Sequence, residues 1–340
     1  MGRAVLNESG PDAGVAWHHG EPLREQRRLA AGEATVDLSH RPVFTIAGPD
    51  RLTWLHAITS QAFEGLAPGV WTTAYVLDPN GRIEHVLGGV DDGETFWATT
   101  EPGHLAALLG WLQRMVFASR VEVADASATH AMVIAGGPRI VARDDLDAVL
   151  GEERAGTWAS EALRIAAGQP RAFLDTDEKT IPNEVAMPDG LALGAGVHLQ
   201  KGCYRGQETV ARVHNLGRPP RRLTRLMLDG SVHALPPHGA PVILRPAEDT
   251  PQARAAARPV GAVTSSAQHH EAGAVALALL KRSVPLDAEL LVCEDLPGDA
   301  EAGDAADAAE TGWIAAAQEP LVSPEAGQVV GRPRGVGRLR

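Results

Sequence analysis

The chain has 340 residues, more than one hydrophobic core usually holds, so two or three domains of roughly 100 residues each are expected. Its 44% hydrophobic and 22% charged residues are ordinary for a globular protein and exclude a fibrous or wholly disordered chain. A net charge of -12 argues against direct nucleic-acid binding, which requires a basic face.

The first half of the chain predicts an α+β fold. Residues 1–25 show no period and are expected to form a loose arm. A helix is predicted to begin near Asp50, and another from Pro102, where leucines recur every three or four residues. Turns such as Asp-Pro-Asn-Gly separate strands predicted at 41–47, 70–77, 82–90, 94–99 and 121–124. This order indicates an antiparallel sheet with helices on one face.

The second half changes character at residues 217–220, which are rich in glycine and proline. Before this boundary we expect a strand at 129–135 and helices at 144–150 and 159–167. After it come short strands typical of a small β-barrel or sandwich, predicted at 223–228, 241–245, 260–265, 275–280 and 289–294. Beyond Pro297 the composition predicts a disordered tail, which Trp313 could tether.

The chain has two cysteines, Cys203 and Cys293, which predict free thiols in a reducing compartment. No signal peptide is expected from the first 14 residues, and the longest apolar run, 272–280, is too short to span a bilayer. We therefore expect a cytoplasmic protein without a membrane partner. Two cysteines are too few for a zinc or ordinary iron–sulfur site, so no resident metal is predicted.

Residues 200–212, QKGCYRGQETVAR, hold the most distinctive pattern. Gly202 and Gly206 permit a tight turn, and the charges of Lys201 and Arg205 would favour the thiolate of Cys203. The alternative is that the cysteine is a small buried hydrophobe in a structural turn. A short helix after the turn would pair Glu208 with Arg212, and we take Cys293 as structural.

This segment is also strongly basic. Between residues 201 and 225 there are seven lysines or arginines and one acid, Glu208. Such a segment would attract an anionic ligand or partner, although a solvated basic loop has the same composition.

The motif KGCYRGQE (201–208) resembles the signature of the YgfZ family of folate-binding proteins, which are linked to iron–sulfur cluster assembly or repair. Other segments resemble, in the same order, the related T-protein of the glycine cleavage system, an aminomethyltransferase. They are 36–61, LRIAAGQPR (163–171), TIPNE (180–184), RPVGAVTSS and VALALLKR. The similarity extends over roughly residues 33–295.

The resemblance implies a three-domain ring that binds tetrahydrofolate in a central hole, with the KGCY loop facing this cavity. The first domain would comprise 1–48 and 128–216, an α+β domain 49–127 would be inserted into it, and a C-terminal β-barrel would span 217–296, followed by the tail 297–340. The folate would be bound by Tyr75, Arg164, Asn183, Glu184 and Arg205. Glu184 would hold the pterin edge, although a helix-capping or surface carboxylate is the alternative.

Three carboxylates of the T-protein, an acidic pair and a glutamate, have no counterpart at the matching positions of this sequence. The T-protein's acidic pair, which includes its catalytic aspartate, falls at His85 and Val86, with Glu84 one position early, and its pterin-contacting glutamate falls at Ala166. Aminomethyl transfer needs a carboxylate to direct the proton of the folate nitrogen, so T-protein activity is not expected.

The resemblance therefore predicts a tetrahydrofolate-binding accessory protein for iron–sulfur enzymes, with assembly proteins or client enzymes, including radical enzymes that modify tRNA, as partners. Cys203 would be its reactive thiol and Lys201 would tune it; Tyr204, Gln207, Glu208 and Arg212 would complete the motif loop. A folate-dependent one-carbon transferase or demethylase, and an interaction scaffold with a vestigial folate site, are the alternatives.

Overall fold

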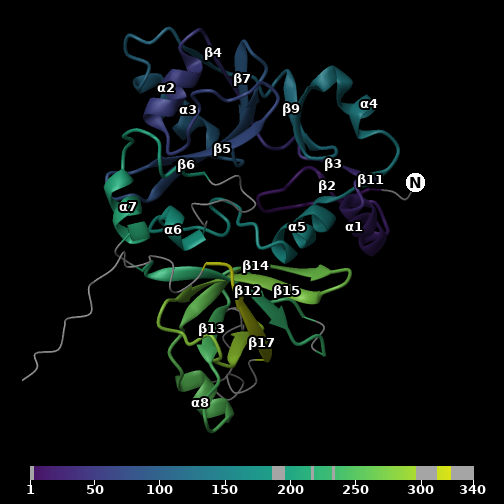
Figure 1. Cartoon of the computed structure of the whole chain (residues 1–340). Helices are drawn as coiled ribbons and strands as arrows, with labels where there is room; N and C mark the ends of the chain where they lie inside the picture. The colour runs from purple at the N-terminus through teal and green to yellow at the C-terminus, as the bar shows by residue number, and fades with distance from the viewer. Residues whose placement is uncertain (1–3, 186–195, 216–217, 232–233, 296–311, 323–340) are drawn as a thin grey trace, which may run out of the picture.

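The computed structural model describes residues 4–185, 196–215, 218–231, 234–295 and 312–322. Two β-sheets lie side by side in the upper half of the molecule and a barrel lies below them (Figure 1). Between these layers lie three helices, α5 (Thr157–Ala166), α6 (Pro182–Val185) and α7 (Gln207–Asn215).

The first sheet is five-stranded and antiparallel, in the order β5-β6-β7-β4-β8. Its strands are β4 (Val43–Ala47), β5 (Trp71–Leu77), β6 (Ile83–Asp91), β7 (Thr95–Thr99) and β8 (Glu122–Asp125). Helices α2 (Arg51–Ile58) and α3 (Leu105–Arg114) pack on one face, where Leu55 and Leu108 meet Phe44 and Phe96 in a buried core. The predicted antiparallel sheet with one helical face is confirmed.

The predicted domain boundary at residue 48 is wrong for β4. This strand was assigned to the first domain, yet it pairs with both β7 and β8 inside the five-stranded sheet. The physical reason is burial: Phe44 and Ile46 are fully buried beneath α2 and α3, so the strand shares their core.

The second sheet has the order β10-β9-β3-β11. It contains β3 (Thr35–Asp37), β9 (His130–Ile134), β10 (Pro138–Ala142) and β11 (Arg154–Ala155), of which β3 and β11 are parallel. Helix α1 (Pro22–Ala30) contacts α5 and β11. The turn η1 (Arg143–Asp145) and helix α4 (Leu146–Leu150) connect β10 to β11.

The predicted loose N-terminal arm is wrong. Strands β1 (Val5–Leu6) and β2 (Ala16–His18) form a hairpin, and α1 follows it. The Asn7 amide donates to Thr157 Oγ1 at 2.8 Å. Gly156 packs so tightly on the backbone of Trp17 that a Cβ there would lie 2.0 Å from the Trp17 carbonyl oxygen. Partners about 150 residues away thus hold the arm.

The C-terminal unit is a closed barrel, in the order β12-β15-β14-β13-β16-β17. Its elements are β12 (Arg221–Leu228), β13 (Pro241–Leu244), α8 (Pro251–Ala256), β14 (Gly261–His269), β15 (Gly273–Lys281), β16 (Leu290–Cys293) and β17 (Trp313–Pro320). The α+β fold with a C-terminal barrel is therefore as predicted.

Strand β17 corrects the prediction of a disordered tail for residues 313–320. It pairs with β12 and β16 and so closes the barrel. Ile314 and Ala316 alternate inward into the barrel core, which explains why this short alanine-rich segment is ordered. Residues 296–311 and 323–340 of the predicted tail lie outside the described residues.

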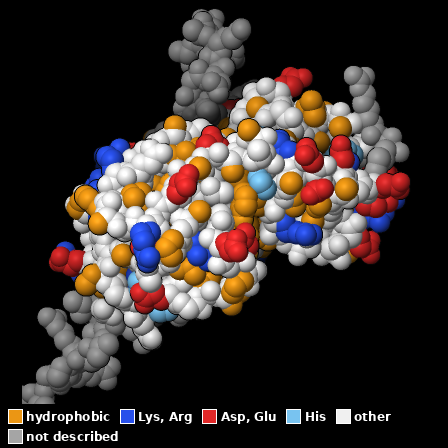
Figure 2. All heavy atoms as spheres, turned by 90° about the horizontal axis from the view of Figure 1, so that it is seen from above, with side chains coloured by type: hydrophobic (Ala, Val, Ile, Leu, Met, Phe, Trp, Pro, Cys, Tyr) orange, Lys and Arg blue, Asp and Glu red, His pale blue; other side chains and the backbone are white. Residues whose placement is uncertain are grey.

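The face of the molecule seen from above is of mixed charge (Figure 2). Acidic and basic side chains are interspersed on the face seen from above, without a wide patch of one sign (Figure 2). None of the described helices is long and apolar enough to cross a membrane.

Candidate functional site

A cavity of about 610 Å³ lies where the two sheets meet α5 and the segment that follows it. Strands β5 and β6 contribute Tyr75 and Val86, β9 contributes Met132 and Ile134, and α5 contributes Arg164. Most of the wall is apolar, and the charged groups that reach it are Arg41, Glu101, Glu161, Arg164 and Arg171. A largely apolar pocket with a few placed charges is the usual form of a small-molecule site.

Arg164 is saturated with partners. Its guanidinium donates to Glu161 Oε2 from Nε at 3.0 Å and from Nη2 at 2.7 Å, and to Asp175 Oδ2 from Nη1 at 2.6 Å. It also reaches the Gln169 carbonyl and Ser265 Oγ. Burial works to lower the pKa of Arg164, but the charges of Glu161 and Asp175 raise it. This arginine is a fixed cation that joins α5 to the barrel.

Arg171 is equally saturated. It forms a two-bond pair with Asp12, at 2.8 and 2.9 Å, and its Nε donates to Glu101 Oε2 at 2.8 Å. Asp12 also contacts His40 Nε2 at 2.8 Å. Burial would raise the pKa of Asp12, but its bonds to His40 and Arg171 hold it well below the usual range. The cluster thus ties the N-terminal hairpin to the cavity wall.

Arg41 differs from both. Its side chain is only 18% exposed, and its sole partner among the described residues is Glu101 Oε1, 3.5 Å from Nη1. Its buried Nε has no hydrogen-bond acceptor in the described part of the chain. Burial lowers the pKa of this guanidinium. Arg41 therefore faces the cavity with most of its donors free.

The wall formed by β6 carries no carboxylate. Ile83, Val86 and Gly88 line the cavity, and Val86 lies opposite Tyr75 in the strand register. Glu84 occupies an irregularity in that register and pairs with Arg205 at 2.7 Å, outside the cavity lining. At the two positions where the sequence resemblance places the T-protein's acidic pair, this chain thus has His85 and Val86, and Val86 lines the cavity.

That histidine, His85, is expected to make stability depend on pH. Burial lowers its pKa to about 4 from 6.5, assisted by the charges of His104, Arg114 and Arg205. Between these values the unfolded chain binds a proton that the folded chain does not. The free energy of unfolding should therefore fall as the pH drops from 6.5 to 4, by on the order of 1 to 2 kcal/mol once solvent screening of this partly exposed ring is allowed for.

Urea denaturation at several pH values would measure this effect. His85→Gln should flatten the dependence in that window, whereas His198→Gln, at an exposed position, should preserve it. An unchanged slope in His85→Gln would contradict the assignment.

The motif loop is anchored by Lys201. Its ammonium donates to the carbonyl of Thr59 at 2.5 Å, to that of Gln61 at 3.1 Å and to that of His56. These are carbonyls at and just beyond the C-terminus of α2, where a cation is stabilised by the helix dipole. Burial lowers the pKa of Lys201 to about 8. Its contacts are those of a structural tie to α2.

Cys203 is exposed and does not line the cavity. The next residue, Tyr204, is buried in the core that also holds Tyr75, Leu77 and Ile83. Arg205 is directed to Glu84, so the two cations predicted to tune the thiol both have other partners. The KGCY loop therefore contacts the cavity wall through Tyr204, while its thiol faces outward, contrary to the predicted orientation.

The rest of the motif packs on the turn between β5 and β6. Gly206 has φ 80°, and a Cβ there would lie 2.5 Å from the Asp78 carbonyl oxygen. Helix α7 begins at Gln207, and Glu208 pairs with Arg212 on its exposed face as predicted. Cys293 is buried in β16.

Asn183 and Glu184 do not line the cavity. Glu184 is fully buried, and its carboxylate accepts from Arg221 Nε at 3.0 Å, from Arg221 Nη2 at 2.9 Å and from the Ile181 amide. The Asn183 amide donates to the Val210 carbonyl at 3.3 Å. Glu184 thus joins α6 to the barrel and, by accepting from the Ile181 amide just before Pro182, caps the start of α6, as the helix-capping alternative predicted; it is neither a surface carboxylate nor part of the cavity lining.

Of the five predicted folate-binding residues, the structure brings Tyr75 and Arg164 to the cavity. Their role in binding stays a prediction. Sequence reasoning missed Arg41, Glu101, Glu161 and Arg171. Arg41 follows Ser39 and His40, and Arg171 is the last residue of LRIAAGQPR. Neither arginine stands in a sequence pattern that distinguishes a residue facing a cavity from one on the surface.

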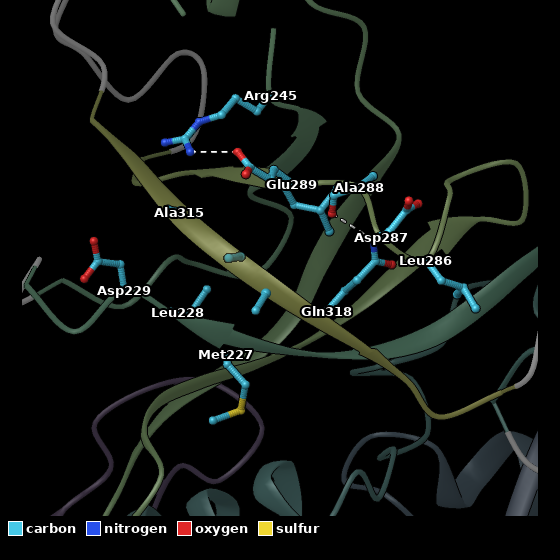
Figure 3. Close-up of a pocket in the computed structure, with 13 residues that line it drawn as sticks. Met227, Leu228, Asp229, Arg245, Leu286, Asp287, Ala288, Glu289, Ala315 and Gln318 are labelled. Carbon is cyan, nitrogen blue, oxygen red and sulfur yellow. Dashed lines mark hydrogen bonds and ion pairs between the residues drawn. The ribbon is translucent and has the colours of Figure 1, made fainter. Parts of the chain in front are cut away.

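A second hollow of about 520 Å³ lies on the barrel, over β12, β16 and β17. Arg245 and Glu289 form an ion pair at its edge, and Met227 and Leu286 flank it (Figure 3). No predicted site residue falls there. In the described residues, no group of three His, Cys, Asp or Glu side chains is placed to hold a metal ion.

Comparison with known proteins supports the fold. The chain superimposes on a crystal structure of the glycine cleavage system aminomethyltransferase T from Bartonella henselae with a TM-score of 0.70 and 16% identity, over 94% of this chain and 93% of that one. The chain therefore has the aminomethyltransferase fold. A chloroplastic protein of Arabidopsis thaliana, provisionally named a transferase, is 25% identical over 246 residues. That match spans 58% of this chain and 56% of the relative's length. No protein-family model matches.

Proposed function

We propose that this protein binds tetrahydrofolate or a derivative in the central cavity and acts as an accessory protein in the assembly or repair of iron–sulfur enzymes. The observation that carries the proposal is a ligand-sized cavity in a chain with the aminomethyltransferase fold, whose β6 wall presents Ile83, Val86 and Gly88 and no carboxylate. The KGCYRGQE motif, which resembles that of the YgfZ family, supports the accessory role.

The residues present fit a folate. The volume of about 610 Å³ lies within the range of small-molecule sites, about 300 to 1,000 Å³. Trp71, Tyr75 and Met132 offer apolar surface for a flat ring, and the arginines and glutamates of the opposite wall offer hydrogen bonds to its polar edge. When bound, tetrahydrofolate would supply the ring nitrogens that carry one-carbon units.

The chain's own residues favour binding over transfer. Glu101 and Glu161 are the carboxylates at the cavity wall; one oxygen of each is held in an ion pair with Arg171 or Arg164, and Oε1 of Glu101 lies 3.5 Å from Arg41 Nη1. A general base must be free to take the proton of the reacting group. Ile83 and Val86 on β6 cannot do so. The cavity would thus hold and orient a folate without an evident group to move its proton.

Cys203 is the group through which the protein would act on an iron–sulfur partner. Its thiol is exposed on a loop that Lys201 and Gly206 hold in place. Assembly proteins or client enzymes would bring the cluster as cargo. Two free thiols are consistent with a cytoplasmic location, where reducing conditions keep them reduced.

Calorimetric titration with tetrahydrofolate, combined with complementation of cells that lack the protein, tests the proposal. Cys203→Ala should bind folate with the affinity of the wild type, because this residue does not line the cavity, yet it should fail to restore iron–sulfur enzyme activity. Cys293→Ala provides the matched control and should restore it, unless loss of this buried side chain unfolds the barrel, which thermal denaturation would reveal. Full restoration by Cys203→Ala would refute the thiol's role.

A folate-dependent one-carbon transferase is the second candidate, favoured by the provisional name of the Arabidopsis relative. Folate-dependent turnover of a small amine, lost in Glu161→Gln and retained in Cys203→Ala, would favour it over the accessory role.

A further inference from the structure

Arg41 and Glu101 hold unused hydrogen-bonding capacity at the cavity wall. We infer that this pair recognises the cyclic amide of a bound pterin: the guanidinium donates to the ring carbonyl, and the carboxylate accepts from the neighbouring ring N–H. The inference rests on the proposed folate binding and adds to it the residues that form hydrogen bonds with the pterin ring.

The donor side is Arg41. Three arginines line the cavity. In two of them, Arg164 and Arg171, every guanidinium nitrogen donates a hydrogen bond to an acceptor within the protein. Arg41 makes no side-chain hydrogen bond to any described residue, and its Nε is buried. A buried donor without an acceptor is costly, so native proteins rarely keep one unless a ligand completes it.

The acceptor side is Glu101. Its Oε2 is taken by Arg171 Nε at 2.8 Å, whereas its Oε1 has only Arg41 Nη1 at 3.5 Å, too long for a strong hydrogen bond. The Glu101 side chain is only 14% exposed, so few water molecules can donate hydrogen bonds to this oxygen. A free donor fork and a free acceptor oxygen therefore lie next to each other. A carbonyl beside an N–H, the cyclic amide of a pterin, matches this arrangement.

The charge of the cluster decides between the two ends of a folate. Arg41, Arg164 and Arg171 face four carboxylates, those of Asp12, Glu101, Glu161 and Asp175, with His40 beside Asp12, so the cluster holds no excess of positive charge. The carboxylates of a folate's glutamate tail would therefore lose solvation there without a net attraction. The neutral ring carries no charge to desolvate. The ring, rather than the tail, therefore belongs against Arg41.

Calorimetric titration of the full chain tests this assignment with two probes, 5-formyltetrahydrofolate and p-aminobenzoylglutamate, which lacks the ring. Arg41→Met should bind 5-formyltetrahydrofolate about ten- to a hundredfold more weakly, the effect of losing a charged hydrogen bond. Its affinity for p-aminobenzoylglutamate should not change. Arg258→Met, at an exposed arginine of the barrel, is the control and should match the wild type.

Thermal denaturation of the ligand-free proteins distinguishes a ligand-binding arginine from a structural one, because loss of a structural arginine would lower the melting temperature. Arg41→Met should melt at or above the temperature of the wild type, because it removes a buried cation without hydrogen bonds. Should Arg41→Met fail to fold, Arg41→Lys keeps the charge without the donor fork and should also bind at least tenfold more weakly.

The outcomes separate the two claims. If the wild type binds no folate, the proposed function fails. If the wild type and Arg41→Met bind 5-formyltetrahydrofolate equally, folate binding stands and the Arg41 assignment falls. If Arg41→Met loses p-aminobenzoylglutamate as strongly as the whole folate, Arg41 binds the tail and the ring assignment is overturned.

Discussion

Replacing Asp175 by alanine should lower the free energy of unfolding by about 3 to 5 kcal/mol, the usual effect of removing one partner from a buried ion pair. Asp175 is fully buried. Its Oδ2 accepts from Arg164 Nη1 at 2.6 Å and from the Arg171 amide at 2.8 Å. Its Oδ1 accepts from the hydroxyls of Thr264 and Ser265 on β14, at 2.5 and 2.6 Å.

The alanine variant would remove the acceptor shared by four donors, two of them on the barrel; Arg164 Nη1 and Thr264 Oγ1 would keep only the carbonyls of Gln169 and Leu277. It should therefore loosen the barrel from the rest of the molecule as well as destabilise the chain. Urea denaturation measures the first effect on stability, and hydrogen exchange at β14 measures the loosening.

Asp147→Ala is the matched control. The side chain of Asp147 is 91% exposed and pairs with Arg154 at 3.1 Å, so its loss should change stability by less than about 1 kcal/mol. If Asp175→Ala proves as stable as Asp147→Ala, the four bonds are not what joins the barrel to the cavity wall.

The second large effect is expected at Gly206 of the motif loop. Alanine there should lower the free energy of unfolding by about 2 to 4 kcal/mol and displace the loop. The backbone has φ 80°, which L-residues rarely adopt, and a new Cβ would approach the Asp78 carbonyl oxygen at 2.5 Å and Gly81 Cα at 2.9 Å. Both neighbours are backbone atoms of a tight turn and cannot move aside cheaply.

The same motif supplies the control. Gly202 lies four residues earlier, and a Cβ built there meets nothing within 4 Å. Gly202→Ala should therefore be close to neutral in stability. The rate at which a thiol reagent labels Cys203 would report the loop's position: it should change in Gly206→Ala and stay near the wild-type value in Gly202→Ala. Equal stability of the two variants would show that the turn tolerates a side chain at both positions.

The contrast between the two glycines bears on how the motif is interpreted. Sequence reasoning assigned both of them to shaping the loop, and it assigned Lys201 to the thiol. In the structure Gly206 and Lys201 hold the loop against the β5–β6 turn and the end of α2, whereas nothing in the packing demands Gly202. The cysteine itself is presented outward.

Short-range sequence patterns were sufficient to predict many of the helices and strands. The leucine spacing after Pro102 and the turns with Asn-Gly and Asp-Gly depend on neighbours within a few residues, so α3 and the hairpins β5–β6 and β6–β7 could be predicted. The strands of the barrel were found for the same reason, except β17. That strand is short and rich in alanine, and only its place between β12 and β16 makes it ordered.

The sequence by itself determined the α+β class and the C-terminal barrel; the absence of the T-protein's carboxylates at His85 and Val86 and a role for residues 201–208 are its predictions. Only the tertiary structure decided which charges face the cavity. Glu184 and Arg41 look alike in sequence, as single charges between one polar and one apolar residue, yet Glu184 is bound by Arg221, whereas Arg41 has only Glu101 at 3.5 Å among the described residues. Which buried charge keeps a partner depends on residues distant in the chain, such as Asp12 beside Arg171. Such pairs form only when folding brings their elements together.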